Sequence, residues 1–313
     1  MRRRRGITLI EVLVAIFIMA IGLLALLTLF PLGALRMSQA LQNDRAAASA
    51  SAAANLCDAL GIRHDPQYDP AAALPRFAAP PAAGMNPSST GPGYPLYVDA
   101  YGVANGSGLL GGVIQRVTPS SGAPGSIFPS PPYTSATSAA ARYFTLPDDI
   151  TFATNGQPDL TANGSVQRGG RYTWAYLLHR LQPYSASSPV DLTVVVYAGR
   201  ATQVPGGENN FAAAGAQNDT LVTLSWAAAA PPPNIRRGSW ILDTSVNAVN
   251  GSVHGDFYRV VTATQTGPTT MNLELQTPLA KAGLTQMTVM DNVVEVFSRG
   301  TEESIKWEFR TEQ

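Results

Sequence analysis

One acidic residue stands in an otherwise uncharged apolar stretch near the start of the chain. From Ile7 to Leu35 the only charged side chain is Glu11, and the stretch is preceded directly by Arg2–Arg5 and Gly6. An ionised carboxylate inside a bilayer costs about 2.5–3.5 kcal/mol even on lenient insertion scales. Glu11 therefore calls for a partner of opposite charge.

The ten residues Gly6–Ala15, GITLIEVLVA, resemble the cleavage and methylation motif of type IV prepilins and type II secretion pseudopilins. The resemblance implies that a prepilin peptidase and methyltransferase cuts between Gly6 and Ile7 and methylates the new amine of Ile7. It also implies that Glu11 faces the amine of a neighbouring subunit in a filament, where each charge offsets the desolvation of the other. Ile7 departs from the Phe that is usual in the family. The continuation Ala20–Leu24 is most similar to PilV-type minor pilins or their type II secretion counterparts.

The length of the apolar stretch favours a transmembrane helix. As a helix, Val12–Leu35 would be about 36 Å long, which exceeds a hydrocarbon core of about 30 Å. Arg2–Arg5 would hold the N-terminus in the cytoplasm and send the bulk of the chain across the inner membrane. A cleaved secretory signal has a shorter apolar stretch of about 7–15 residues, and a plain single-pass anchor leaves Glu11 unexplained. We expect a helix kink near Gly22 and Pro31, because proline lacks an N–H and crowds the preceding turn.

The helix is predicted to continue beyond the apolar stretch. Residues 36–60 are rich in Ala, Leu and Gln, and Gly61 is well placed to end the helix. Apolar and small residues at helical spacing predict a stripe that packs on a sheet: Met37, Leu41, Ala48, Ala52 and Leu56. The single cysteine, Cys57, excludes an internal disulfide and a cysteine-based metal cluster, and we expect it to be a small packed residue.

Two further spacings could support ligand chemistry but fail on context. Gly106–Gly111 matches a dinucleotide-binding glycine pattern, yet no long helix fits before Pro119. Three acids could surround a calcium ion, but their spacing fits no standard loop, so turn and capping roles are favoured: Asp148, Asp149 and Asp159. His179 lies in a predicted strand among scattered histidines, which favours a packed or surface role over metal ligation. The sequence therefore predicts no cofactor, no metal and no enzymatic activity.

A nucleic-acid partner is not expected either. Arg236 and Arg237 beside Trp240 supply only two charges, which a solvated turn explains. Without Arg2–Arg5 the chain has 17 basic residues, from a total of 21, against 21 acidic ones. A mildly acidic body argues against a general nucleic-acid surface.

The remainder of the chain divides by composition. Residues 61–143 hold most of the prolines and predict an irregular lobe rich in Pro, Gly and Ala, with one short strand at 95–99. Residues 144–313 show strand patterns throughout, with a central hairpin predicted at 172–181 and 190–197. A possible small β module covers 235–313. Further strands are predicted at 220–226, 240–243, 257–264, 271–275, 288–290 and 293–297.

These observations predict an α+β, pilin-like fold. The expected parts are a leader at 1–6 and a helix at 7–60, of which 7–35 is transmembrane; the helix packs on an antiparallel β-rich domain that carries a Pro/Gly-rich insertion. The predicted function is that of a structural subunit, a minor pilin or pseudopilin, in a type IV pilus or type II secretion-like filament. Its expected partners are the prepilin peptidase, other pilins or pseudopilins, the inner-membrane assembly platform and membrane lipid.

The predicted location is the bacterial inner membrane with a periplasmic C-terminal domain, followed by a periplasmic or cell-surface filament. The alternative is a membrane-tethered binding module that recognises a sugar, a protein or DNA and does not polymerise.

Overall fold

The computed structural model describes residues 9–64, 95–105, 109–117, 143–160, 166–180, 189–200, 207–247 and 253–302. The chain divides into two compact units, residues 1–45 and 46–313. Three helical elements lie in the described residues: α1 (Leu9–Ala59), η1 (Ile62–His64) and α2 (Ala100–Ala104). Twelve strands lie in the same residues: β1 (Pro95–Val98), β2 (Leu109–Leu110), β3 (Ile114–Val117), β4 (Tyr172–Arg180), β5 (Val190–Ala198), β6 (Glu208–Ala214), β7 (Leu221–Ser225), β8 (Trp240–Asp243), β9 (Asp256–Gly267), β10 (Thr270–Leu275), β11 (Gln286–Met290) and β12 (Val293–Glu302).

The first helix, α1, is 51 residues long and remains helical through Gly22 and Pro31. It ends where predicted, because Gly61 has a φ of +57° that β-carbon-bearing residues rarely adopt. The N–H of Gly61 donates to the carbonyl of Asp58 at 3.0 Å and so closes the last turn. Within the described part of the chain, no helix is long and apolar enough to cross a membrane, and the span expected over residues 7–35 is not confirmed.

Six strands of the second unit form one sheet in the order β12-β5-β4-β1-β3-β2. The predicted central hairpin is confirmed, since β4 and β5 pair in antiparallel register from Tyr172↔Ala198 to Arg180↔Val190. The expectation of a purely antiparallel sheet is wrong at one position, because β1 and β3 pair in parallel. Two parallel strands need a connection that returns the backbone to the end of the sheet at which the first strand began. The connection from β1 to β3 contains α2.

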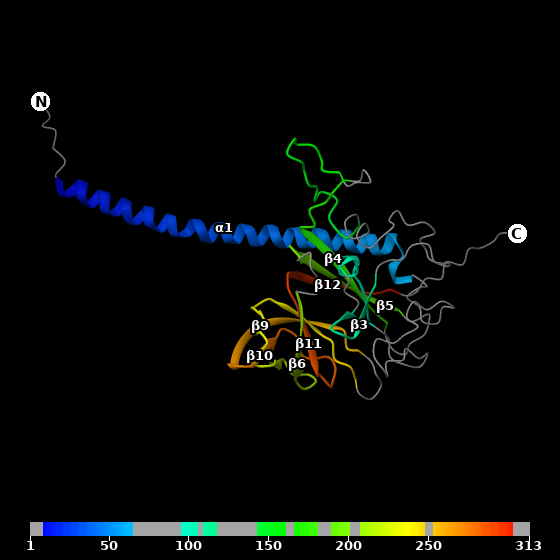
Figure 1. Cartoon of the computed structure of the whole chain (residues 1–313). Coiled ribbons are helices and arrows are strands. Elements are labelled where there is room, and N and C mark those ends of the chain that lie inside the picture. Colours follow the sequence, from blue (N-terminus) through cyan, green and yellow to red (C-terminus); the bar gives the residue numbers. More distant parts are fainter. Residues whose placement is uncertain are drawn as a thin grey trace, which may run out of the picture. The chain divides into compact units, whose positions relative to one another are not determined.

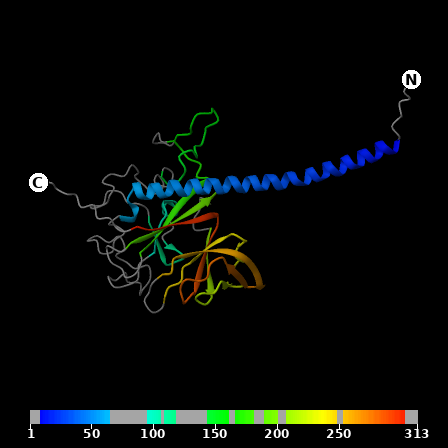
Figure 2. The same ribbon diagram turned by 180° about the vertical axis from the view of Figure 1, so that it is seen from behind.

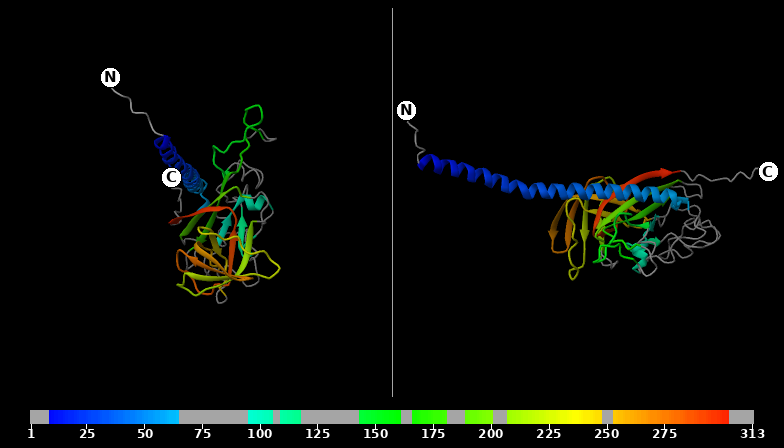
Figure 3. Two further views of the ribbon diagram at one scale, coloured as in Figure 1. Left: turned by 90° about the vertical axis from the view of Figure 1, so that its left-hand side faces the viewer. Right: turned by 90° about the horizontal axis from the view of Figure 1, so that it is seen from above.

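The other six strands form a closed antiparallel barrel in the order β10-β7-β6-β11-β8-β9. The barrel is an insertion in the sheet, because it occupies the chain between β5 and β12, which are neighbours in that sheet. The two ends of the insertion meet where the N–H of Asp291 donates to the carbonyl of Gly207 at 2.8 Å. In both views of Figure 3 the barrel strands form a group of their own beside the sheet.

The sheet lies between the barrel and the C-terminal part of α1, as Figures 1 and 2 show. One core joins the face of β4 and β5 that carries Trp174, Tyr176 and Val194 to small residues of the helix: Ala46, Ala50, Ala53 and Cys57. Another core joins the opposite face to the barrel. Residues at these helix positions are four, three and four apart, so they share one face, and their small size allows the helix close to the sheet.

Several boundaries differ from those predicted. The face of α1 that packs on the sheet is rotated from the predicted one, because Ala48 is exposed and Ala46 is buried. Residues 46–54 are all small, so their pattern could not indicate which face of the helix is buried. The proposed irregular lobe contains β1, α2, β2 and β3 within its described residues, and β1 sits inside the sheet. The expected module at 235–313 also differs from the barrel, which begins with β6 and excludes β12.

Candidate functional site

Of the residues that the sequence singles out for assembly, the structure describes Glu11, Gly22 and Pro31, all on α1. Gly6 and Ile7 lie outside the described residues. Glu11 is exposed in the first turn of α1. Gly22 and Pro31 are both helical, and the kink expected at them stays a prediction.

The helix surface around Glu11 is apolar and exposed. Among the large apolar side chains described between Leu9 and Leu41, exposed fractions run from 47% at Val12 to 81% at Leu9. Soluble proteins rarely expose a continuous apolar surface of this kind unless another molecule covers it. The N-terminal part of α1 therefore has the surface of an element that is buried in an assembly or in lipid.

The C-terminal part of α1 is fixed to the sheet by hydrogen bonds as well as by packing. The hydroxyl of Tyr176 on β4 donates to the carbonyl of Ala53 at 2.7 Å, and the indole N–H of Trp174 donates to the Tyr176 hydroxyl at 3.1 Å. Arg63, just beyond the helix, donates to the carbonyls of Val190 on β5 and Gly300 on β12. This part of the helix is thus an integral piece of the β-rich unit.

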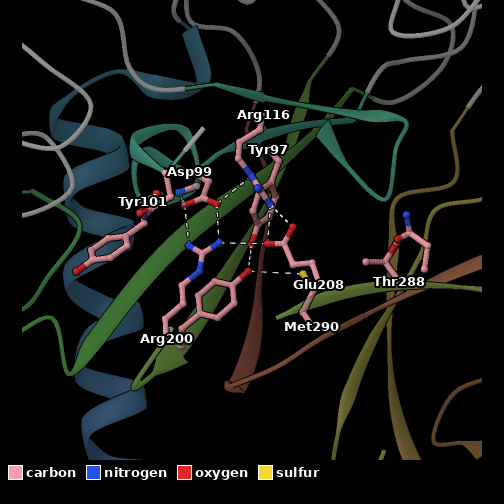
Figure 4. Close-up of polar contacts among 12 residues, drawn as sticks. Tyr97, Asp99, Tyr101, Arg116, Arg200, Glu208, Thr288 and Met290 are labelled. Atoms are coloured by element: carbon pink, nitrogen blue, oxygen red, sulfur yellow. Dashed lines mark hydrogen bonds and ion pairs between the residues drawn. The ribbon is translucent and has the colours of Figure 1, made fainter. Parts of the chain in front are cut away.

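A second polar cluster is buried on the opposite face of the sheet, where the barrel is inserted (Figure 4). Asp99 follows β1, Arg116 lies on β3, Arg200 follows β5 and Glu208 begins β6. The side chains of Asp99 and Arg116 are fully buried, and those of Arg200 and Glu208 are 4% and 9% exposed. We call these four residues the neck cluster, because Arg200 and Glu208 flank the point where the chain leaves the sheet for the barrel.

The neck cluster is held by short, paired contacts. Arg200 binds Asp99 through both terminal nitrogens, with Nη1–Oδ1 and Nη2–Oδ2 distances of 2.8 Å. Arg116 places Nε 3.0 Å from Asp99 Oδ2 and donates through Nη2 to both oxygens of Glu208 at 2.7 and 2.8 Å. Gly102 adds its backbone N–H to Asp99 Oδ1 at 3.0 Å and has no room for a side chain, since a β-carbon would lie 2.4 Å from Arg116 Cδ.

The electrostatics of the neck cluster favour full ionisation. Burial alone would raise the pKa of Asp99, but the charges of Arg200 and Arg116 and the hydrogen bonds from Arg200 and Gly102 outweigh burial, so the pKa of that carboxyl lies below its usual range. The pKa of Arg116 is raised, because Asp99 and Glu208 outweigh the effect of burial. Two positive and two negative charges therefore balance within the cluster.

Two tyrosines extend the cluster toward the barrel. The hydroxyls of Tyr97 and Tyr197 are hydrogen-bonded to each other, and the Tyr197 hydroxyl also contacts Met290 Sδ at 3.6 Å. The Arg200 guanidinium lies 4.2 Å from the centre of the Tyr197 ring. Burial, as the largest cause, raises the pKa of Tyr197 to about 12. Because its members are closed off from solvent, the cluster can fix positions but has no access for a substrate.

The comparisons with known proteins concern the N-terminus. Residues 1–27 match the family model described as the prokaryotic N-terminal methylation motif. The chain carries a prepilin-type N-terminus. This finding confirms the resemblance to type IV prepilins and pseudopilins drawn from Gly6, Ile7 and Glu11, while the closer likeness to PilV-type proteins is not confirmed. A search of curated proteins gave no match.

A prepilin-type N-terminus is typical of structural proteins. The remaining spacings agree with ordinary structural roles. The carboxylate of Asp149 accepts the N–H of Arg171, 22 positions away, at 2.6 Å, and the backbone N–H of Asp149 donates to the carbonyl of Leu146 at 3.2 Å in a turn. Arg236 donates its backbone N–H to Ser239 in a turn. Among the described residues, no group of three or more His, Cys, Asp or Glu side chains could hold a metal ion.

His179 lies half-buried on β4 beside a small cleft. Burial, followed by the charge of Lys281, lowers the pKa of His179 to about 4. The imidazole is therefore neutral at physiological pH. The residues 106–108 of the glycine-rich run lie outside the described residues, and Gly111 forms the turn between β2 and β3 with a φ of +64°.

The neck cluster is the feature that sequence reasoning missed. Its members are separated by up to 109 positions, from Asp99 to Glu208, so no local spacing connects them. The one available signal was a charge placed directly after a fully apolar strand, as Asp99 follows Pro95–Val98, in a chain with only 13% charged residues.

Proposed function

We propose that this protein is a minor subunit, a minor pilin or pseudopilin, of a type IV pilus or type II secretion-like filament. In this proposal a prepilin peptidase cuts after Gly6, the amine of Ile7 is methylated, and α1 mediates assembly with other pilins on an inner-membrane platform. The observation that carries it is the methylation motif at residues 1–27. The exposed apolar surface of α1 supports it, since a filament core would cover that surface.

Before assembly, the same proposal places the N-terminal part of α1 in the inner membrane and the β-rich unit in the periplasm. The support is in the sequence, where Arg2–Arg5 precede the stretch and Val12–Leu35 carries no charge. Carbonate extraction of membranes tests this step. Release of the full chain into the supernatant would contradict membrane anchoring.

Processing is tested by mass spectrometry of the N-terminus of the protein purified from its native host. The expected mature chain begins at Ile7 with a methylated amine. Gly6→Phe should block cleavage, because the bulky side chain replaces the glycine at the proposed scissile bond. A wild-type chain that retains Arg2–Arg5 would overturn the proposal.

Assembly is tested at Glu11. In the proposed filament this carboxylate faces the Ile7 amine of a neighbour in an apolar setting, and breaking such a buried pair costs about 3–5 kcal/mol. Glu11→Ala should therefore still be cleaved but should enter sheared filaments at least tenfold less efficiently. Asp44→Ala is the matched control, because Asp44 is an exposed acid on the same helix.

The same experiment separates the alternative function. A tethered binding module that never polymerises would be absent from sheared filaments whether or not Glu11 is changed. Equal incorporation of wild type and Glu11→Ala would retain assembly but would remove the proposed role of this acid.

A further inference from the structure

The barrel has an open groove at the end nearest its point of insertion. Its volume is about 530 Å³, within the range of small-ligand sites. One wall is the segment Ala227–Asn234, which follows β7 and contains Pro231–Pro233; the rest comes from β6 and from the end of β11. The mouths of β-barrels are common places for ligand sites.

The floor of the groove is aromatic. Phe211 on β6 and Trp226 after β7 lie in edge-to-face contact, with ring centres 6.4 Å apart and planes at 84°. Phe211 belongs to the barrel core, whereas Trp226 is only partly buried and also lines the groove. A partly exposed indole offers a flat surface on which the C–H face of a ligand can stack.

The rim of the groove is polar and carries almost no charge. Asn209, Asn210 and Asn234 are exposed and line it, and Asp291 supplies the one charged side chain among the lining residues that the structure describes. Asn209 is two positions before Phe211, which faces the barrel interior, so the side chain of Asn209 points to the same face of β6, at the mouth of the barrel. Each amide can donate and accept at the same time, which matches pairs of hydroxyl groups.

The groove is also preorganised. Asn209 and Asn210 lie on β6, where they pair with Val289 and Thr288 of β11. The three prolines restrict the backbone of the opposite wall. Such a site loses little conformational freedom when a ligand binds.

We propose that this groove binds a neutral oligosaccharide. An aromatic floor with amide groups at the rim matches the two surfaces of a sugar ring, its C–H face and its hydroxyl edge. Because Asp291 is the only charged residue among the described lining residues, and it is negative, phosphates, acidic sugars and nucleic acid are disfavoured. The proposed site would bind the same ligand in a filament subunit and in a tethered subunit, so this proposal does not depend on polymerisation.

The test uses the full-length protein in dodecylphosphocholine, a detergent without a sugar headgroup. Maltotriose, cellotriose and triacetylchitotriose are the neutral probes, sialyllactose is the anionic probe, and a blocked proline-rich nonapeptide represents an extended peptide. Saturation-transfer NMR should detect at least one neutral probe at about 1 mM, the weak end of specific binding. Tryptophan fluorescence should change with that probe in wild type and in Trp240→Phe, but not in Trp226→Phe.

Variants at the rim locate the binding. The double variant Asn209→Ala/Asn234→Ala should bind the probe at least tenfold more weakly, and it should fold normally because both side chains are exposed. Asn43→Ala, an exposed asparagine on α1, is the matched control and should bind like wild type. The proposal is overturned if no neutral probe binds, if sialyllactose or the peptide binds in their place, or if the double variant keeps wild-type affinity.

Discussion

Removing the carboxylate of Asp99 should be among the most damaging single changes in the β-rich unit. Asp99→Ala would leave Arg116 and Arg200 with Glu208 as their only acidic partner in the neck cluster, so the buried cluster would carry an excess positive charge. It would also remove the cap that Asp99 provides to the N–H of Gly102. Breaking a buried ion pair costs about 3–5 kcal/mol, and loss of a cap adds about 1 kcal/mol. We expect the free energy of unfolding to fall by about 4–6 kcal/mol.

Two comparison variants separate the causes. Asp99→Asn keeps the shape of the side chain and an oxygen that can accept the Gly102 N–H, so it isolates the loss of charge. Asp58→Ala removes a carboxylate whose side chain is 54% exposed and lies 4.0 Å from Arg63. Exposed pairs contribute about 0–1 kcal/mol, so this variant should unfold close to wild type.

The measurement is guanidinium-induced unfolding of the full-length protein, followed by circular dichroism of the β-rich unit. The difference in midpoint multiplied by the slope gives the change in free energy. Because the pKa of Asp99 is lowered in the folded state, its contribution is present above the ordinary carboxyl pKa and is lost as pH falls through the lower folded value. A cost below about 1 kcal/mol for Asp99→Ala, the value expected of an exposed pair, would refute the account of the neck cluster.

Three further outcomes are expected. The pKa of His179 falls to about 4 on folding, so between pH 6.5 and 4 the unfolded chain gains a proton that the folded chain does not. The free energy of unfolding should therefore drop by up to about 3 kcal/mol over that window. In pH-dependent unfolding experiments, His179→Gln should show a smaller drop. The thiol of Cys57 is fully buried, so it should react with maleimide only after unfolding, and rapid native labelling would contradict its packed position. Gly111→Ala should destabilise more than Gly283→Ala in thermal melts, because both have positive φ but only at Gly111 would a β-carbon meet Thr244, at 2.4 Å; equal losses would show that the backbone alone sets the cost.

Strands with a clear alternation were predictable from the sequence, and strands without one were not. The strand β10, predicted at 271–275, alternates buried residues with less buried ones, and Met271, Leu273 and Leu275 face the barrel core. The strand β6 has the sequence ENNFAAA, which is poor in β-branched residues and rich in Asn and Ala. It forms because β7 and β11 supply partners on both sides, which is a tertiary effect that no local pattern contains.

The N-terminal motif and the neck cluster differ in the same way. Gly6, Ile7 and Glu11 lie within six positions, so their relation is legible in the sequence itself and the family model detects it. Asp99 and Glu208 come together only because the chain leaves the sheet after β5 and enters the barrel through β6. In the sequence, where the order of the strands in the sheet and barrel is not known, nothing distinguishes either residue from other charged residues in loops or at strand ends.

The insertion of the barrel explains the place of the neck cluster. The strands β5 and β12 would be a simple hairpin if the barrel were absent, because they are neighbours in the sheet and pair from Val293↔Tyr197 onward. An inserted domain needs its two ends close together, and the hydrogen bond between Asp291 and Gly207 meets this requirement. The apolar contacts between barrel and sheet are not directional, so they alone would leave the angle between the two weakly defined. The bidentate pair of Arg200 with Asp99 is directional, and through Glu208 it extends to the first residue of the barrel. The neck cluster therefore sets which face of the barrel, including its open groove, the subunit presents.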